Sequence, residues 1–357
     1  MGMLSLRLLT MVLVVVVSPS AAVFAQPPSR PAAEANIRQL AQAGQFEGAL
    51  AAYDRYVTAA SHLPDAGLLA IIARAQLDAL AGNQDPAIAA DALERLASAG
   101  DEHARATLRE RAAAPAGSPV ATAATEALLR LGDPATVAQI ATLVSKAPPE
   151  NRGALIQSLE KSGAASAGPA VAAFLADESP QVRAVAAQAV GALGVRDAVP
   201  ALQRMFERDE PTVKTFAAVA LKKLGQPSVD AYVGELLASE VPQVRLMAAG
   251  AYKPSESRVW LPLVRELRND PNPMMRLQTA ERLACCDAAT ARVLLLEALN
   301  SPIPLMRDEA ARIIDTTNLA DAKIARQLMG DTFEMPRLHG AGIALRLSRA
   351  PERGGKR

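Results

Sequence analysis

Apolar residues recur at helical spacing along most of the chain, in blocks of similar sequence. One block runs from Ser179 to Gly194, and its apolar positions are spaced four, four and three residues apart, at Val182, Ala186, Val190 and Leu193. This spacing places them on one face of an α-helix. Pro180 favours a helix start, because the N–H that proline lacks would be unpaired there anyway, and Gly194 favours a helix end.

The block returns at intervals of 31 residues. Its Pro-x-Val-Arg start, or a close variant, occurs at Pro180–Arg183, Pro211–Lys214, Pro242–Arg245, Pro273–Arg276 and Pro304–Arg307. A fixed period of this length is typical of stacked arrays, because one repeat cannot bury its apolar face without its neighbours. One position is alanine in all five copies, which indicates close approach between neighbouring helices; the column is Ala187, Ala218, Ala249, Ala280 and Ala311.

A second helix fits between successive blocks, with apolar positions such as Leu202, Met205 and Phe206. No strand signal competes, so we predict an all-α fold, an α-solenoid built of helix pairs. Polar residues stand three positions before the block's proline and are expected to cap the first turn; they are Asp177, Ser239, Asp270 and Ser301.

Weaker copies of the block extend the array toward the N-terminus, at Asp85–Ile88, Ser118–Val120 and Pro149–Arg152. Residues 43–53 resemble instead the second helix of a tetratricopeptide unit. We therefore expect a signal peptide (1–25), a flexible lead (26–31), an N-terminal tetratricopeptide-like helical segment (32–84), the repeat array (85–330), a C-terminal capping helix (331–349) and a disordered tail (350–357).

The first residues predict export. Arg7 is followed by an apolar run from Leu8 to Val17, and Val23-Phe24-Ala25 offers small residues for cleavage after Ala25. The run is about ten residues, whereas a membrane span needs about 20. We expect a periplasmic or secreted protein, with an uncleaved N-terminal anchor as the alternative. No integral membrane span is expected after cleavage.

Charge and cysteine content narrow the functional classes. Cleavage removes Arg7 and no acid, so the 38 basic residues become 37, against 37 acidic residues. A nucleic-acid-binding protein would show a basic excess, so we expect no nucleic-acid partner. The only cysteines, Cys285 and Cys286, are adjacent, a spacing that disfavours a disulfide. We interpret them as packing residues late in a helix, with a redox- or metal-sensitive site as the alternative.

The repeated pattern Pro-x-Val-Arg-x-x-Ala-Ala-x-Ala-Leu-x-x-Leu-Gly resembles HEAT repeats, an armadillo-type fold, in the short form of bilin-lyase-type HEAT repeats. The resemblance implies a right-handed superhelix of helix pairs whose second helices line the concave side. It also implies a scaffold or protein-binding role, although fold alone does not fix function.

Two charge patterns follow the repeat. A basic residue occupies the fourth position of the block in six copies: Arg152, Arg183, Lys214, Arg245, Arg276 and Arg307. We interpret it as a structural ladder between repeats, with a basic stripe for an acidic ligand as the alternative. On the second helices, Glu235, Glu266 and Glu297 share one register, with Arg204 one repeat earlier. They are candidate partner-binding residues if those helices line the concave face, and an ordinary solvated face otherwise.

The repeat pattern breaks after Ala251. Here the chain reads Tyr252-Lys-Pro-Ser-Glu-Ser-Arg258 and then Val259-Trp260, and Pro254 should end the first helix of this repeat early. Because Trp, Tyr and Arg are favoured binding anchors, Tyr252, Arg258 and Trp260 are candidate partner-binding residues. The alternative is local repacking, in which Trp260 fills the space that a shortened helix leaves.

No catalytic or metal motif is found. The only histidines, His62, His103 and His339, are scattered, and none is followed by the Glu that HEAT-like deoxyhypusine hydroxylases use to hold iron. We expect no cofactor and no enzymatic activity. The prediction is an exported scaffold or adaptor that binds a protein partner on its concave face. The alternative is a HEAT-fold enzyme or small-ligand carrier with a pocket near Tyr252–Trp260.

Overall fold

The structure, a computed structural model, describes residues 28–59, 63–317 and 319–349. The predicted signal peptide and C-terminal tail, and the first two residues of the predicted lead, lie outside these residues. The described residues form helices and turns without a strand, as the apolar spacing predicted. No helix in this part of the chain is long and apolar enough to cross a membrane.

The N-terminal segment contains three helices, α1 (Arg30–Gln42), α2 (Phe46–Ala59) and α3 (Ala66–Leu80). Helices α1 and α2 pack against each other and against α3. Asp65 begins α3, because its carboxylate accepts a hydrogen bond of 3.0 Å from the backbone N–H of Leu68.

The helices of the array form two rows. The helices of the inner row, here called the inner helices, begin with the repeated block or a weaker copy of it, except for the last one. They are α4 (Pro86–Ser98), α6 (Pro119–Arg130), α8 (Pro149–Lys161), α10 (Pro180–Leu193), α12 (Pro211–Lys223), α14 (Pro242–Ala249), α16 (Pro273–Leu283), α18 (Pro304–Thr316) and α20 (Glu334–Arg349). Between them lie α5 (Glu102–Ala112), α7 (Pro134–Lys146), α9 (Gly168–Ala172), α11 (Val199–Arg208), α13 (Asp230–Leu237), α15 (Ser257–Arg265) and α17 (Ala288–Leu299), here called the outer helices, and α19 (Ala322–Met329). Short 3₁₀ turns flank several outer helices: η1 (Ala165–Ala167), η2 (Ala173–Ala176), η3 (Arg196–Ala198), η4 (Pro227–Val229), η5 (Pro254–Glu256) and η6 (Glu266–Asn269).

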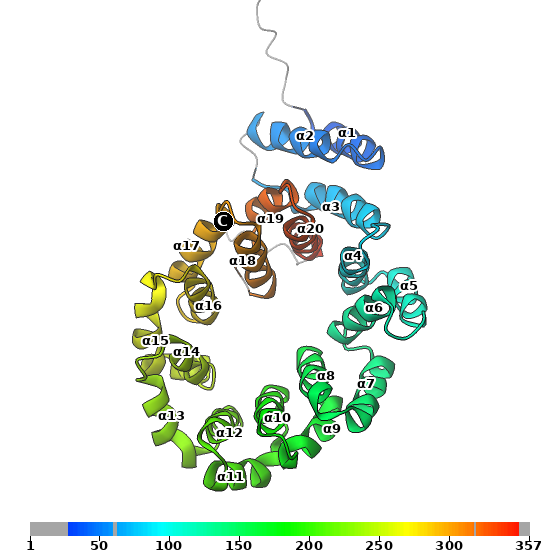
Figure 1. The fold of residues 1–357 in the computed structure, drawn as a ribbon. Coiled ribbons are helices and arrows are strands. Elements are labelled where there is room, and N and C mark those ends of the chain that lie inside the picture. Colours follow the sequence, from blue (N-terminus) through cyan, green and yellow to red (C-terminus); the bar gives the residue numbers. More distant parts are fainter. Residues whose placement is uncertain (1–27, 60–62, 318, 350–357) are drawn as a thin grey trace, which may run out of the picture.

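The array curves into a ring, with the inner helices toward the centre and the outer helices around them (Figure 1). The second helices therefore do not line the concave side, and that expectation was wrong. The reason lies in side-chain size, because only small residues let helices approach closely enough for the shorter inner circumference. The alanine column is fully buried, and a Cβ atom at Gly191 of α10 would lie 2.8 Å from the Cα atom of Ala220 in α12.

The last helices of the ring meet the first ones. Helix α20 packs on α3, α4, α18 and α19, and α19 also contacts α3 (Figure 1). We call this contact between α3–α4 and α18–α20 the seam. The side-chain amide of Gln76 in α3 donates to the carbonyl oxygen of Met329 at 3.1 Å, and Arg326 of α19 pairs with Asp54 of α2 at 2.5 Å. One continuous apolar core thus runs from Ala33 to Leu345.

Candidate functional site

The four charged candidates lie on the second helices or directly after one of them, and these helices form the outer row of the ring (Figure 1). Arg204, Glu235, Glu266 and Glu297 are all exposed. They recur every 31 residues along this outer row. Among these four residues, Glu297 forms an ion pair, with Arg276 at 3.5 Å. The prediction that these residues form a concave-face interface was therefore wrong, because their helices do not line the concave side.

The ladder residues brace the loops that precede the inner helices. Arg183, Arg276 and Arg307 each donate from Nη1, at 2.9 Å, to the carbonyl oxygen of the residue six positions earlier, and Arg245 does the same. Those earlier residues are the predicted caps, Asp177, Ser239, Asp270 and Ser301. Their side chains accept from the backbone N–H two residues later, before the helix begins, so they fix the loop and not the first turn.

Carboxylates complete part of the ladder. Arg183 pairs with Asp209 at 2.6 Å, Arg307 pairs with Asp331 at 2.8 Å, and the hydrogen bond from Arg183 lowers the pKa of Asp209. Arg152 pairs with Asp177 at 2.7 Å. Lys214 lies instead 5.0 Å from the ring centre of Phe206 and 5.2 Å from that of Tyr232. With its cations held in this way, the ladder presents few donors to an acidic ligand.

The break in the repeat is a packed region. Helix α14 ends at Ala249, so the predicted shortening occurs, and η5 follows at Pro254. Trp260 is 0% exposed, and the guanidinium carbon of Arg282 lies 4.1 Å from the centre of its ring. Tyr252 is buried beneath Lys222, whose Nζ is 4.5 Å from the ring centre. Trp260 and Tyr252 are therefore not surface anchors, whereas Arg258 is exposed.

The two cysteines lie in the turn after α16, beside this break. Cys286 is half-buried but Cys285 is exposed, so packing does not account for both side chains. Their sulfur atoms are 2.7 Å apart. Burial and the neighbouring Cys285 raise the pKa of Cys286 to about 11.

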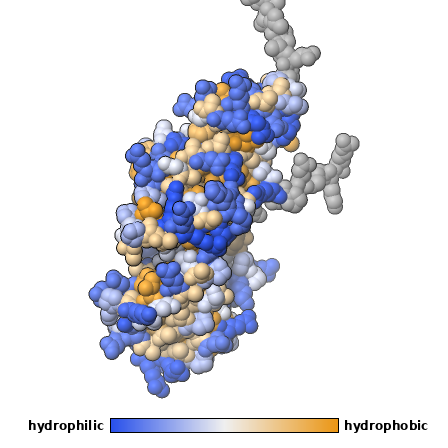
Figure 2. Space-filling model, turned by 90° about the vertical axis from the view of Figure 1, so that its right-hand side faces the viewer, coloured by the Kyte–Doolittle hydropathy of each residue, from blue (hydrophilic) through white to orange (hydrophobic). Residues whose placement is uncertain are grey.

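Exposed apolar side chains gather at one edge of the ring. The N-terminal ends of the inner helices form this edge, here called the proline edge. Val120, Val241, Ile303, Leu305 and Phe333 are exposed on it, each within two residues of a helix start. On the side of the ring shown in Figure 2, by contrast, hydrophobic residues form only small groups among hydrophilic ones.

Three of these residues belong to consecutive repeats, and we call Ile303, Leu305 and Phe333 the apolar edge patch. Arg307 joins the two repeats, because it pairs with Asp331 and its guanidinium carbon lies 5.3 Å from the centre of the Phe333 ring. Beside Ile303 lies a cavity of about 310 Å³, lined by the α16–α18 residues Leu277, Leu294, Met306, Arg276 and Glu297, among others. An apolar patch thus borders a cavity with a charged rim.

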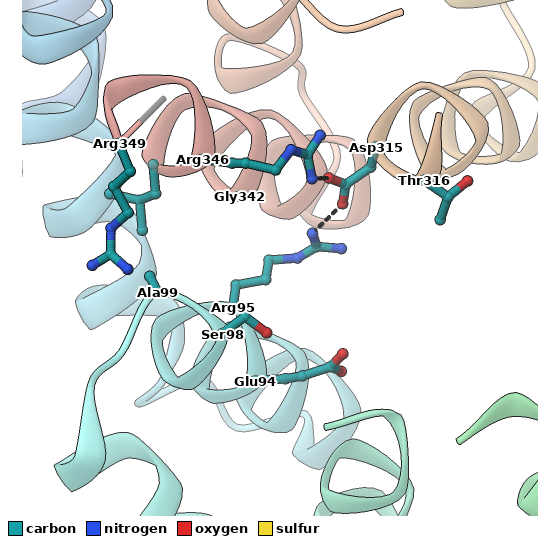
Figure 3. A pocket seen from close by; sticks show the side chains of 10 residues that line it. Glu94, Arg95, Ser98, Ala99, Asp315, Thr316, Gly342, Arg346 and Arg349 are labelled. Carbon is teal, nitrogen blue, oxygen red and sulfur yellow. Dashed lines mark hydrogen bonds and ion pairs between the residues drawn. The ribbon is translucent and has the colours of Figure 1, made fainter. Parts of the chain in front are cut away.

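A second cavity of about 310 Å³ lies at the seam, between α4, α18 and α20 (Figure 3). Arg95 and Arg346 approach the carboxylate of Asp315 from opposite helices, at 2.5 and 2.6 Å. Arg349 extends along the cavity wall near Ala99 (Figure 3). This cluster holds the first and last inner helices together.

His339 of α20 lies behind these ion pairs. Its Nδ1 is 2.9 Å from Nη2 of Arg95 and 3.0 Å from Asp315, and its Nε2 is 3.6 Å from Asp308. Burial and the charge of Arg95 lower the pKa of His339, which favours its neutral ring. Burial alone would raise the pKa of Asp315, but His339 and Arg95 hold it well below its usual range.

Sequence reasoning did not find the seam cluster. Arg95 is 220 residues from Asp315 and 244 from His339 in the chain, and no local pattern connects them. The proline edge did carry a sequence signal, because Val120, Val241, Ile303 and Leu305 stand directly before or after a proline that begins an inner helix. In the part of the chain that the structure describes, no group of three or more His, Cys, Asp or Glu side chains is placed to hold a metal ion.

Comparison with known proteins agrees with the repeated pattern. Residues 168–253 match the family described as HEAT repeats, and no curated protein matches the sequence. Among solved structures, the chain is similar to the complex of CpcE and CpcF of phycocyanin lyase from Nostoc sp. PCC7120. The identity is 20% and the TM-score 0.39, over 70% of this chain and 94% of that one. The chain thus contains HEAT repeats, and its described residues form an all-α solenoid.

Proposed function

We propose that this protein is an exported HEAT-repeat scaffold, without catalytic activity of its own, that binds a protein partner at the proline edge. The observation that carries the proposal is the apolar edge patch. Ile303, Leu305 and Phe333 are 53%, 63% and 46% exposed, although each could have been polar at no cost to the core. Exposed apolar side chains grouped near a cavity are typical of protein interaction sites.

The charges around the patch fit a protein partner better than a lipid surface. Arg307 is already held by Asp331, while Glu297 on the rim of the cavity has 64% of its side chain exposed. An apolar centre with a polar rim is the usual anatomy of a protein interface. Export is the part of the proposal that rests on residues 1–25 alone, through their charge and apolar run.

The alternative of a ligand pocket at Tyr252–Trp260 is less well supported, because the indole of Trp260 fills the space that the short α14 leaves. A concave-face interface would have to use the inner helices, whose exposed side chains differ from the candidates on the second helices.

Site-specific photo-cross-linking in the native cell envelope tests the proposal. A photoreactive residue replaces Leu305 in one variant and Val293 in the other, since both are exposed apolar residues, at 63% and 66%, but Val293 lies on an outer helix. We expect one reproducible protein adduct from position 305 and none from position 293. Equal adducts at both positions, or none at either, would remove the proline edge as the docking site.

A further inference from the structure

Two thiols that the scaffold function does not use lie side by side on the surface. Cys285 and Cys286 are the only cysteines of the chain, and their Sγ atoms are 2.7 Å apart in the turn after α16. Cys285 is exposed and Cys286 half-buried, so solutes can reach the thiol of Cys285. The other copies of the repeat carry no cysteine at these positions; Ala192 and Leu193 stand there in the block that runs from Ser179 to Gly194.

The surroundings of the thiols are unlike the rest of the array. Because α14 ends early, Cys286 faces the loop at Pro254, and its Sγ lies 3.8 Å from the carbonyl oxygen of that residue. The Sγ of Cys285 lies 3.5 Å from the carbonyl oxygen of Arg282. The guanidinium of Arg282, one turn away, bonds to the carbonyl oxygen of Tyr252 at 2.9 Å and covers Trp260.

Adjacent cysteines are poorly placed for a disulfide with each other. The Cα atoms of neighbouring residues are about 3.8 Å apart across a trans peptide bond, whereas disulfides span Cα separations of about 4.4–6.8 Å. Free thiols on the surface of an exported protein would also be open to oxidation. A ligand that binds both sulfur atoms would protect the thiols, and it needs no S–S bond between them.

We propose that Cys285 and Cys286 form a dithiol site for a thiophilic ion that accepts two thiolate donors, such as monovalent copper or a trivalent arsenical. Soft thiolates select soft ions. The described residues near the turn do not complete a group of three or more metal-binding side chains, which disfavours zinc and its four ligands. The site is independent of the proline edge and of the proposed partner.

Binding involves no electron transfer. With monovalent copper, two Cu–S bonds form and each thiol loses one proton to solvent. With a phenylarsenic(III) dihydroxide, two As–S bonds form and two As–O bonds break, and each departing hydroxide leaves as water with one thiol proton. Both reactions therefore consume two thiols per ion.

Phenylarsine oxide added to the reduced full-length mature protein tests the site. We expect one arsenical per chain by intact mass, loss of both free thiols, and a change in fluorescence from Trp260, which is the only tryptophan. Trp260 reports on the site because the guanidinium carbon of Arg282 lies 4.1 Å from its ring centre, and Arg282 is only three residues before Cys285.

The matched variants are Cys285→Ser and Cys286→Ser, which keep size and polarity and leave one thiol each. Because the second sulfur binds intramolecularly, losing it should weaken arsenical binding about 100-fold or more. Equal affinity in wild type and either variant would overturn the chelate, as would isolation of the wild type as a stable Cys285–Cys286 disulfide. Monovalent copper, offered against a competing copper chelator, forms the second arm. Retention of both probes supports a general soft-ion site, retention of one alone restricts the site to that ion, and retention of neither refutes it.

Discussion

A single added methyl group should distinguish the seam from the rest of the array. Gly340 lies inside α20, and a Cβ atom there would be 2.7 Å from both the Cβ atom of Leu328 and the backbone nitrogen of Met329. It would also be 3.0 Å from the carbonyl oxygen of Ala325. Two of these three atoms are backbone, so they cannot rotate away. Gly340→Ala must therefore push α20 away from α19.

The magnitude follows from two opposing terms. Replacing glycine by alanine inside a helix favours the helix by about 1 kcal/mol. Overpacking a filled contact costs about 1–3 kcal/mol. Gly153 in α8 provides the matched control, because a Cβ atom there would have no heavy atom within 4 Å apart from its chain neighbours and the backbone of its own helix. Gly153→Ala should gain the first term alone, so the two variants should differ by about 1–3 kcal/mol.

The assay is native-state hydrogen exchange resolved by segment, since a repeat array need not unfold in one step. For Gly340→Ala, amides of α20 and of α3, its partner across the seam, should exchange faster than in the control variant. The expected difference corresponds to about 5- to 150-fold in the opening equilibrium. Amides of α10 and α12, far from the seam, should not change. If Gly340→Ala slowed hydrogen exchange in α20 as much as Gly153→Ala slows it in α8, the close contact at the seam would not exist.

Three further predictions concern charge and burial. The pKa of Asp315 is lowered in the folded state, so this carboxylate stabilises the seam above the unfolded pKa of about 3.9, and the contribution is lost as the pH falls below it. Asp315→Asn should reduce the protection of seam amides from hydrogen exchange at pH 7 and flatten the loss of that protection between about pH 5 and pH 3. If the pH dependence of this protection were unchanged, the assignment would be contradicted. Trp260→Ala should cost about 3–5 kcal/mol in denaturant melts as a buried truncation and leave cross-linking from position 305 intact; loss of the adduct with unchanged stability would restore Trp260 as an anchor. Leu221 is 0% exposed and Leu193 only half-buried. In denaturant melts, Leu221→Ala should therefore lower the free energy of unfolding by about 2–5 kcal/mol and Leu193→Ala by clearly less. The reverse order would contradict the assigned core face.

Local structure followed from the sequence because its signals are local. Proline at the helix start and glycine at Gly194, which has a φ of 70°, set the ends of α10 as the pattern predicted. The apolar spacing identified the helices, and Pro254 identified the short α14. Candidate interface residues were less well predicted, because aromatic and charged side chains at a break indicate either a surface anchor or a buried packing residue. The burial of Trp260 depends on how the next repeat stacks.

The sequence by itself determined the repeat, its period, its helices and its small-residue contacts, since each is encoded within one or two neighbouring repeats. The tertiary structure alone decided which row of helices faces inward and that the last repeat returns to the first. Ring closure results from small rotations accumulated over many repeats, and no single repeat contains that sum. For the same physical reason, the contacts of Arg95 with Asp315 and of Gln76 with Met329, separated by 220 and 253 residues, leave no local pattern.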